Sequence, residues 1–283
     1  MPKIAVITDT DSSLPPQVAA QYGIRLVPIT IEFAGESFTT GVDIDDRLLF
    51  EKIDRQNKLP TTSAPSPSAF AHAYEAAFTG GAEAVLCICV SSKVSSTYSS
   101  ALTACESFPG RPIIVIDSLT LCMGQGFMAL AAAEAAQQGA ALDEAEARVR
   151  EVGNRLHLYA VVPTLKYLAL SGRVGKLVAG MADTLDIKPV LTVCDGSLVL
   201  LERVRTQKKA VERMLELVSQ ALAGKEIERL AIIHVNNVEG ALALQEQICA
   251  AHDYAGPFIT APFTPGLSVH AGSGVVGVVI QTR

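Results

Sequence analysis

The sequence contains no tryptophan, few aromatic residues and few charged residues. Aromatic residues make up 5% of its 283 positions and charged residues 18%, whereas hydrophobic residues make up 49%. The 23 basic residues form no run that could neutralise a row of phosphates, and the net charge is -6. We therefore do not expect nucleic acid as a partner. The 14 prolines and 21 glycines follow no fixed period, which excludes collagen-like and disordered classes.

Long hydrophobic runs are also missing. A membrane-spanning helix needs about 20 apolar residues, and Asp, Glu, Lys, Gly or Pro interrupts each candidate stretch. The apolar run near the N-terminus is too short for the core of a signal peptide. The six cysteines show no CxxC spacing, and most lie in apolar segments, as expected for buried thiols in a reducing compartment. We expect a cytoplasmic protein without stable membrane insertion.

Short apolar runs alternate with longer helical patterns along the chain. Continuous apolar character predicts strands buried on both faces of a parallel sheet, at 3–8, 84–90, 113–117, 230–235 and 275–281. Apolar residues spaced as on one face of a helix predict a helix over 67–78, with Ser66 as its N-cap and Pro67 in its first turn. Further helices are predicted at 128–138, 142–156, 208–223 and 238–251. This order is typical of an α/β protein.

One segment departs from the β-α-β order. Two β-type runs, 187–193 and 198–205, are joined by a segment whose Asp195-Gly196 pair is a strong hairpin signal. We therefore predict two domains. The first, residues 1–158, has a mostly parallel sheet with helices on both faces, and the second, residues 159–283, is an α/β domain with a mixed or antiparallel sheet. We expect the C-terminal strand to return to the first domain.

Two hydroxyl-rich segments precede predicted helices. Thr62 and Ser63 lie before the helix at Pro67, and Ser95 and Ser96 follow the predicted strand 84–90. In both places the hydroxyls could simply cap a helix. They could also bind an anion, because ligands bind beyond the carboxyl ends of parallel strands and helix N-termini favour negative charge.

Other candidate groups carry a weaker signal. His270 stands between glycine-containing stretches near the C-terminus, where the backbone can approach a ligand closely. Asp9 and Asp11 could hold Mg²⁺, although the next serines, Ser12 and Ser13, fit better as caps of a following helix. The remaining histidines lack metal-ligand spacing, and we assign no metal site. No GxxxxGK[ST] or GxGxxG fingerprint for a nucleotide is present.

Five ordered segments resemble motifs of the DegV family, whose members are fatty-acid-binding proteins that serve bacterial fatty acid kinase. They are IAVITDTDSSLP, TSAPSPSAF, SSKVSSTYSSA, DSLTLCMGQG and SVHAGSGVVGVVI, and they span residue 4 to the C-terminus in the family's order. The sequence departs from the family pattern at three positions. Ala64 stands in place of Gln, Ser96 in place of Gly and Ser273 in place of Pro.

The resemblance implies a long-chain fatty acid buried between two domains. Carried over by position, Thr62, Ser63, Ser95, Ser96 and His270 would hold its carboxylate. Arg173 matches an arginine that lies near the pocket mouth in the family and is implicated in productive interaction with the kinase. Its alternative role is to cap the nearby helix end. The implied partner is a separate ATP-binding kinase subunit that converts the carboxylate to an acyl phosphate. On this reading the chain is a monomer, is not itself an enzyme and needs no cofactor.

Simple energetics support a lipid-binding role. A C16 chain has about 15 methylene and methyl groups, and their burial at about 0.8 kcal/mol each contributes on the order of 12 kcal/mol before ordering costs. The carboxylate must keep charge-assisted hydrogen bonds, which hydroxyls and an imidazole can provide. Apolar candidates for the tail pocket are Ile29, Phe33, Val190 and Leu191.

Two other functions remain open. In a hydrolase, His270 would activate Ser95 as the nucleophile, although the G-x-S-x-G elbow is absent around this serine. In a kinase similar to dihydroxyacetone kinase, a histidine would hold the small-molecule substrate, and a nucleotide site that the sequence does not display would be needed.

Overall fold

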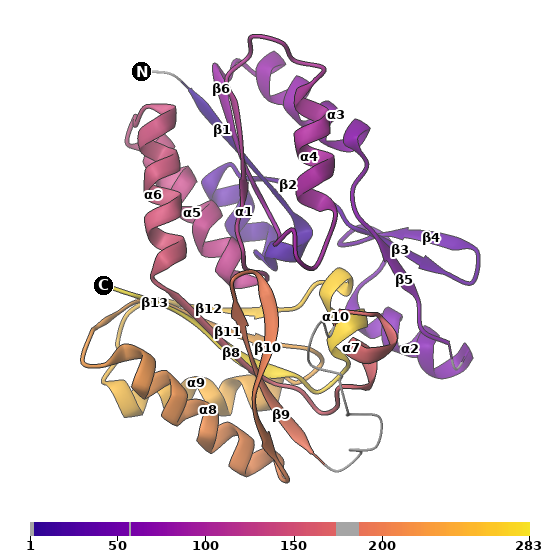
Figure 1. Cartoon of the computed structure of the whole chain (residues 1–283), viewed down its shortest axis with the longest axis vertical. Helices are drawn as coiled ribbons and strands as arrows, with labels where there is room; N and C mark the ends of the chain where they lie inside the picture. Colours follow the sequence, from indigo (N-terminus) through magenta and orange to yellow (C-terminus); the bar gives the residue numbers. More distant parts are fainter. Residues whose placement is uncertain (1–2, 57, 174–186) are drawn as a thin grey trace.

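Two β-sheets form the centres of the two halves of the molecule, one above the other in Figure 1. The computed structural model describes residues 3–56, 58–173 and 187–283. The upper half contains a four-stranded parallel sheet, and the lower half contains a six-stranded sheet. Among the described residues, no helix has both the length and the apolar character needed to cross a membrane.

The four-stranded sheet is covered by helices on both faces, as predicted. Its strands, in spatial order, are β2 (Arg25–Val27), β1 (Ile4–Asp9), β6 (Ala84–Cys89) and β7 (Ile113–Asp117). Two helices pack on one face, namely α3 (Pro67–Thr79) and α4 (Thr97–Cys105). Three lie on the other side: α1 (Pro16–Tyr22), α5 (Met123–Gln137) and α6 (Leu142–Asn154). Every residue of β6 is buried, because both faces of this central strand are covered.

Local sequence signals set the ends of several elements. Ser66 caps α3 by accepting a hydrogen bond from the backbone N–H of Ala69 at 3.2 Å, with Pro67 as the first helical residue. Ser12 and Ser13 do not cap α1, contrary to our expectation, because α1 begins only after Pro15. A short 3-10 helix, η1 (Thr10–Ser12), comes first, and the Asp9 side chain caps it.

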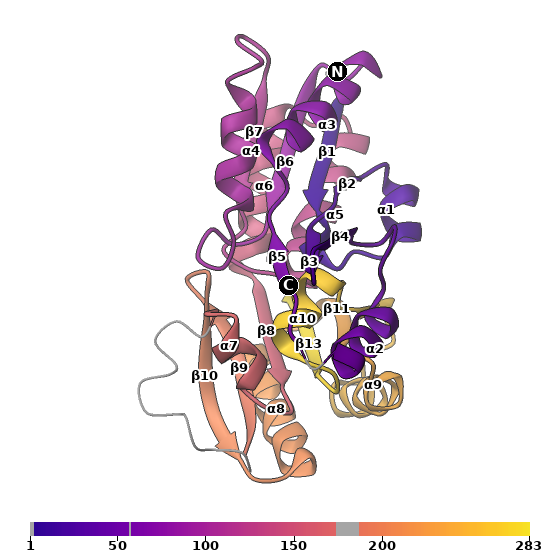
Figure 2. The same ribbon diagram turned by 90° about the vertical axis from the view of Figure 1, so that its right-hand side faces the viewer.

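A small antiparallel sheet that the sequence analysis did not predict lies beside the junction of the two halves (Figures 1 and 2). Its spatial order is β4 (Glu36–Thr39), β3 (Thr30–Phe33) and β5 (Thr61–Ser63). The helix α2 (Asp46–Gln56) connects β4 to β5 in the chain. Strand β5 of this sheet carries Thr62, one of the residues expected to bind the carboxylate.

The six-stranded sheet of the second half is mixed. Its spatial order is β10 (Ser197–Val204), β9 (Lys188–Cys194), β8 (Leu156–Val161), β13 (Val276–Thr282), β11 (Ile227–His234) and β12 (Phe258–Pro262). Only the β11–β12 pair is parallel among these described pairings. The predicted hairpin is confirmed at β9–β10, where Asp195 (φ 48°) and Gly196 (φ 79°) both take the positive φ that a tight hairpin turn requires.

The position of the C-terminal strand was predicted wrongly. β13 does not join the first sheet; it pairs antiparallel with both β8 and β11 in the second. The sequence shows that this strand is apolar and buried, but its neighbours depend on long-range pairing that an apolar run does not encode. The predicted boundary between residues 158 and 159 falls within β8.

One face of the six-stranded sheet looks away from the first domain and carries α8 (Gln207–Leu222) and α9 (Val238–His252). Strand alternation sends Tyr159 and Val161 of β8 toward these helices. Leu158 and Ala160 point the other way, toward the first domain. The short helices α7 (Lys166–Leu170) and α10 (Pro265–Ala271) lie at this junction and contact each other.

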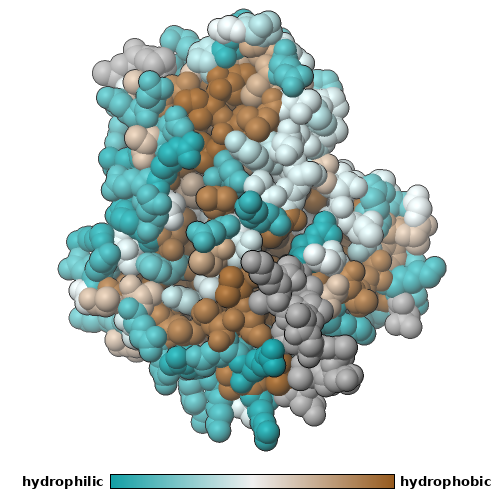
Figure 3. Space-filling view, in the orientation of Figure 1, coloured by the Kyte–Doolittle hydropathy of each residue, from teal (hydrophilic) through white to brown (hydrophobic). Residues whose placement is uncertain are grey.

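Apolar residues also reach the surface in two places visible in Figure 3. One patch lies in the upper half, where the edge strand β7 has half-buried Ile113, Ile114 and Val115. The other lies in the lower half over the β9–β10 hairpin.

Candidate functional site

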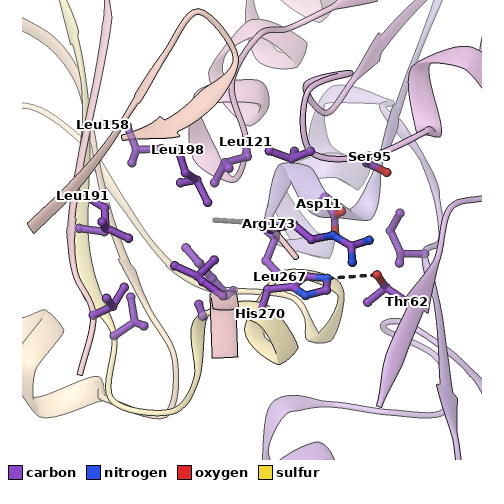
Figure 4. A pocket seen from close by; sticks show the side chains of 18 of the residues that line it. Asp11, Thr62, Ser95, Leu121, Leu158, Arg173, Leu191, Leu198, Leu267 and His270 are labelled. Carbon is purple, nitrogen blue, oxygen red and sulfur yellow. Dashed lines mark hydrogen bonds between the residues drawn. The ribbon is translucent and has the colours of Figure 1, made fainter. Parts of the chain in front are cut away.

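A cavity of about 130 Å³ lies between the two sheets, and both domains contribute to its walls. One end is apolar, and Leu158 and Leu191 line it from β8 and β9 (Figure 4). The other end is polar, with Asp11, Thr62, Ser95, Ser96, Arg173 and His270. The cavity therefore has the amphipathic character of its expected ligand, with an apolar body and a polar head.

The apolar end follows from the alternation of the second sheet. Leu158, Ala160 and Val162 occur at every second position, so their side chains share the face that looks toward the first domain. α8 and α9 cover the opposite face of the sheet. The face that carries these three residues is covered by the first domain, and the cavity lies between the two. Of the four tail candidates, Ile29 and Leu191 line the cavity. Phe33 and Val190 do not; they belong to the apolar cores, and Val190 faces the helix side.

Thr62 and His270 meet at the polar end. Thr62 Oγ1 and His270 Nε2 lie 3.1 Å apart, although 208 positions separate them in the sequence. Ser63, the next residue of β5, is exposed and does not line the cavity, because neighbouring strand residues point to opposite faces. The structure thus brings Thr62 to the site and leaves Ser63 outside it.

Ser95 and Ser96 reach the cavity from the loop that follows β6. Ser95 Oγ lies 2.8 Å from Thr97 Oγ1 and accepts a longer hydrogen bond, 3.3 Å, from the backbone N–H of Thr97. Ser96 is exposed, lines the rim and precedes α4 without a side-chain capping bond. In the described part of the chain, His270 bonds to Thr62 rather than to Ser95. The nucleophile-base pair of a serine hydrolase is therefore not assembled.

Arg173 lies at the cavity wall beside Asp11 and His270 (Figure 4). Its Nη1 donates to the backbone oxygen of Ser171 at 2.6 Å, so the helix-end capping role considered above is also present. Both Arg173 and His270 also line an outer groove with Lys58, Lys166 and Tyr167. These two residues consequently separate the inner cavity from the surface.

The histidine is electrically neutral at neutral pH. Burial and, to a lesser extent, the nearby Arg173 charge lower the pKa of His270 to about 4. Its Nδ1 is buried and has no hydrogen-bond partner among the described residues. An anion entering the polar end would meet a charged guanidinium, uncharged hydroxyls and a neutral imidazole.

The two acidic residues after β1 have different environments. Asp9 is fully buried, and its oxygens accept hydrogen bonds from Val90 N, Asp11 N and Gln125 Nε2. Asp11 lines the cavity and is 6% exposed. Because hydrogen bonds to the protein occupy Asp9, the two carboxyl groups do not form an open Mg²⁺ site. No cluster of three or more potential metal-ligating side chains occurs within residues 3–56, 58–173 and 187–283.

Sequence reasoning missed Asp11 as a cavity residue, along with several apolar side chains from distant segments: Leu121, Leu158, Leu198, Phe263 and Leu267. Asp11 carried a usable signal, since it follows the carboxyl end of a buried strand, where ligands bind in α/β sheets. The apolar residues carried none, because their meeting depends on how the two domains pack.

Comparisons with known proteins decide the family. A family model described as "Uncharacterised protein, DegV family" matches residues 3–283. The chain belongs to the DegV family. A DegV domain-containing protein of Halalkalibacterium halodurans is 34% identical over 278 residues, which is 98% of each chain.

Solved DegV structures share the whole fold. A DegV family protein from Thermus thermophilus, described by its fatty acid binding, aligns with a TM-score of 0.94 at 29% identity over 99% of this chain and 100% of its own. DegV from Bacillus subtilis, described as a fatty acid binding protein, aligns with a TM-score of 0.91 at 29% identity over 100% of both chains. These relatives confirm the predicted α/β fold.

Proposed function

We propose that this DegV protein binds a long-chain fatty acid in the cavity between its domains. The observation that carries the proposal is the division of one cavity into an apolar end and a polar end that holds Thr62, Ser95, Arg173 and His270. The solved relatives described as fatty acid binding proteins support the same ligand. The tail supplies most of the affinity, and the head group fixes the orientation.

Each polar residue has a defined part in this proposal. Thr62 and Ser95 donate hydroxyl hydrogen bonds to the carboxylate, and the Ser96 hydroxyl reaches the same head group from the rim. His270 completes the site through its bond to Thr62. Ser63 is not included, because its side chain points to solvent.

The cavity must widen around a complete acyl chain. An engineered apolar cavity of about 150 Å³ holds one benzene ring, and the volume here is about 130 Å³. We propose that the cavity-lining side chains rotate, or that the domains separate slightly, when the tail enters.

The protein then presents the carboxylate to a separate ATP-binding fatty acid kinase subunit. Arg173 and His270 lie between the cavity and the outer groove, so a carboxylate held there is within reach from the surface. The partner forms the acyl phosphate, and this chain shields the tail. Arg173 acts at the pocket mouth, where Arg173→Gln should reduce phosphorylation by the kinase more than it weakens fatty acid binding. We further propose that the chain acts as a cytoplasmic monomer.

Native mass spectrometry of the protein purified from cells tests the binding step. We expect a stoichiometric C14 to C18 fatty acid that is lost in the triple variant Thr62→Ala/Ser95→Ala/His270→Ala. Ser63→Ala is the matched control, since it removes a neighbouring hydroxyl outside the cavity. A wild-type protein that is empty and takes up no added fatty acid would overturn the proposal. Hydrolysis of an acyl ester that Ser95→Ala abolishes would replace it with the hydrolase function.

A further inference from the structure

Asp11 is a buried carboxyl group inside the polar end of the cavity. It belongs to η1, directly after the first strand of the parallel sheet, and it is 6% exposed. Figure 4 shows its side chain between Ser95 on one side and Arg173, His270 and Thr62 on the other. A group in this position must interact with any head group that the cavity holds.

Asp9 and Asp11 differ in the hydrogen bonds available to them. Asp9 accepts from Val90 N at 2.8 Å, from Gln125 Nε2 at 2.9 Å and from Asp11 N at 2.9 Å. Donors of this kind stabilise the ionised form of a carboxyl group. Asp11 Oδ1 is buried and, within the described chain, accepts no hydrogen bond. The surroundings therefore favour a charge on Asp9 and not on Asp11.

The protein backbone encloses Asp11 on the side of α10. A side chain at Gly266 would collide with Asp11 Oδ1, so the absence of one allows the first turn of α10 to lie directly against the carboxyl group. This close packing excludes water from that side. Asp11 also lines the cavity, so a group bound in the cavity can supply the missing hydrogen-bond partner.

We propose that Asp11 is a further head-group residue, a neutral carboxylic acid whose O–H donates a hydrogen bond to the carboxylate of the bound fatty acid. The inference rests on the proposed function and adds a protonation requirement to it. Two carboxyl groups then share one proton and one negative charge, an arrangement that avoids repulsion between two carboxylates in a partly dry site.

The neighbouring charges are consistent with a neutral Asp11 in the empty protein. Burial raises the pKa of Asp11 well above its ordinary value, the nearby Asp9 raises it further, and Arg173 opposes the rise. Two neighbouring groups have pKa values below pH 7, and a third has a pKa value above pH 10. The pKa of His270 is lowered to about 4, burial raises that of Asp9 to about 6, and burial raises that of Cys122 to about 12.

The sign of the pH dependence follows from this arrangement. Above the pH at which Asp11 ionises in the empty protein, the fatty acid can bind only if Asp11 takes up a proton. The affinity should therefore fall by up to about tenfold for each pH unit in that range. Asp11→Asn keeps a hydrogen-bond donor but cannot ionise, so its affinity should not change across the same range.

The experiment is calorimetric titration of the full chain with dodecanoate between about pH 7 and about pH 10, where the ligand itself stays ionised. Dodecan-1-ol is the uncharged control ligand, and its affinity for the wild-type protein should not fall with pH in this way. Asp54→Asn is the control variant, since it removes an exposed carboxyl group in the outer groove and should keep the wild-type pH dependence. Asp11→Leu, which has no donor, should bind dodecanoate on the order of 10- to 100-fold more weakly than Asp11→Asn near pH 7.

Several outcomes separate this inference from the proposed function. Tighter dodecanoate binding by Asp11→Asn than by the wild type near pH 7 would show that Asp11 is ionised and repels the ligand, which overturns the inference. Equal dodecanoate affinities of Asp11→Asn and Asp11→Leu near pH 7 would also overturn it, because a hydrogen-bond donor at this position would then have no part in binding the carboxylate. In either case dodecanoate would still bind, so the proposed function would stand. Failure of the wild type to bind dodecanoate at all would overturn both.

Discussion

Replacing Asp46 with asparagine should stabilise the protein at neutral and alkaline pH. Asp46 begins α2 and is 9% exposed, and neither carboxylate oxygen has a hydrogen-bond partner among the described residues. Its pKa is raised from 3.8 to about 7, mainly by burial and to a lesser extent by the charge of Asp45. The nearby Ser268 hydroxyl opposes this rise but does not reach hydrogen-bonding geometry.

The size and sign of the effect follow from linkage. Between pH 3.8 and about pH 7 the folded protein holds the Asp46 proton that the unfolded chain has released, so the stabilising effect of the neutral form is lost as the pH rises. A difference of about three pKa units corresponds to about 4 kcal/mol above pH 8. Asparagine resembles the protonated acid and does not ionise. Asp46→Asn should therefore match the wild type near pH 4 and exceed its stability by about 3 to 4 kcal/mol near pH 8.

Urea unfolding of both proteins at several pH values measures the difference. Asp45→Asn is the matched control, because Asp45 is exposed, and asparagine can still accept the 2.8 Å hydrogen bond from the Leu48 backbone N–H at the start of α2. Its stability should stay close to that of the wild type at each pH. A gain for Asp46→Asn that is the same at pH 5 and pH 8, or a loss of stability at pH 8, would refute the reasoning.

Two further variants test the buried polar network and the tail cavity. Gln125→Leu should lower the free energy of unfolding, measured in urea, by about 2 to 3 kcal/mol, because Gln125 Nε2 donates to Asp9 and Thr8 inside the core. Gln137→Leu, at an exposed position of the same helix, should have little effect. Equal effects of the two variants would contradict the role of this network. Ala160→Leu adds three carbon atoms to the apolar end. It should weaken dodecanoate binding by roughly 50-fold, at about 0.8 kcal/mol for each displaced methylene, while affecting octanoate binding less. Equal losses for the two chain lengths in parallel titrations would show that the tail does not occupy this end.

The elements that could be predicted are those with strong local signals. α3 has a serine cap, a proline in its first turn and a regular apolar face, and the β9–β10 hairpin has Asp-Gly in its turn. The three-stranded sheet was missed, because β5 is only three residues long and lies in a cluster of Thr, Ser and Pro that is typical of a loop. The neighbours of β13 were wrong because strand pairing is a long-range property.

The same distinction between local signals and long-range packing applies to the site. Thr62, Ser95 and His270 were found from hydroxyl-rich segments, a glycine-rich loop and the family resemblance, and the structure places them together in one cavity. Ser63 could have been excluded only after β5 was known to be a strand, since alternation then separates it from Thr62. The close packing around Asp11 involves Gly266, which is 255 positions away in the chain and could not be identified from local sequence.

The central place of β13 determines when the cavity can form during synthesis. The parallel sheet uses strands that all lie before residue 118, so the ribosome releases its parts early. The second sheet cannot close until β13 enters between β8 and β11, and β8 precedes β13 by more than 100 residues. Until then, the apolar wall that Leu158 and Ala160 contribute has no complete sheet to support it. A nascent chain of this protein would therefore expose apolar surface, and the cavity could form only after translation has passed β13.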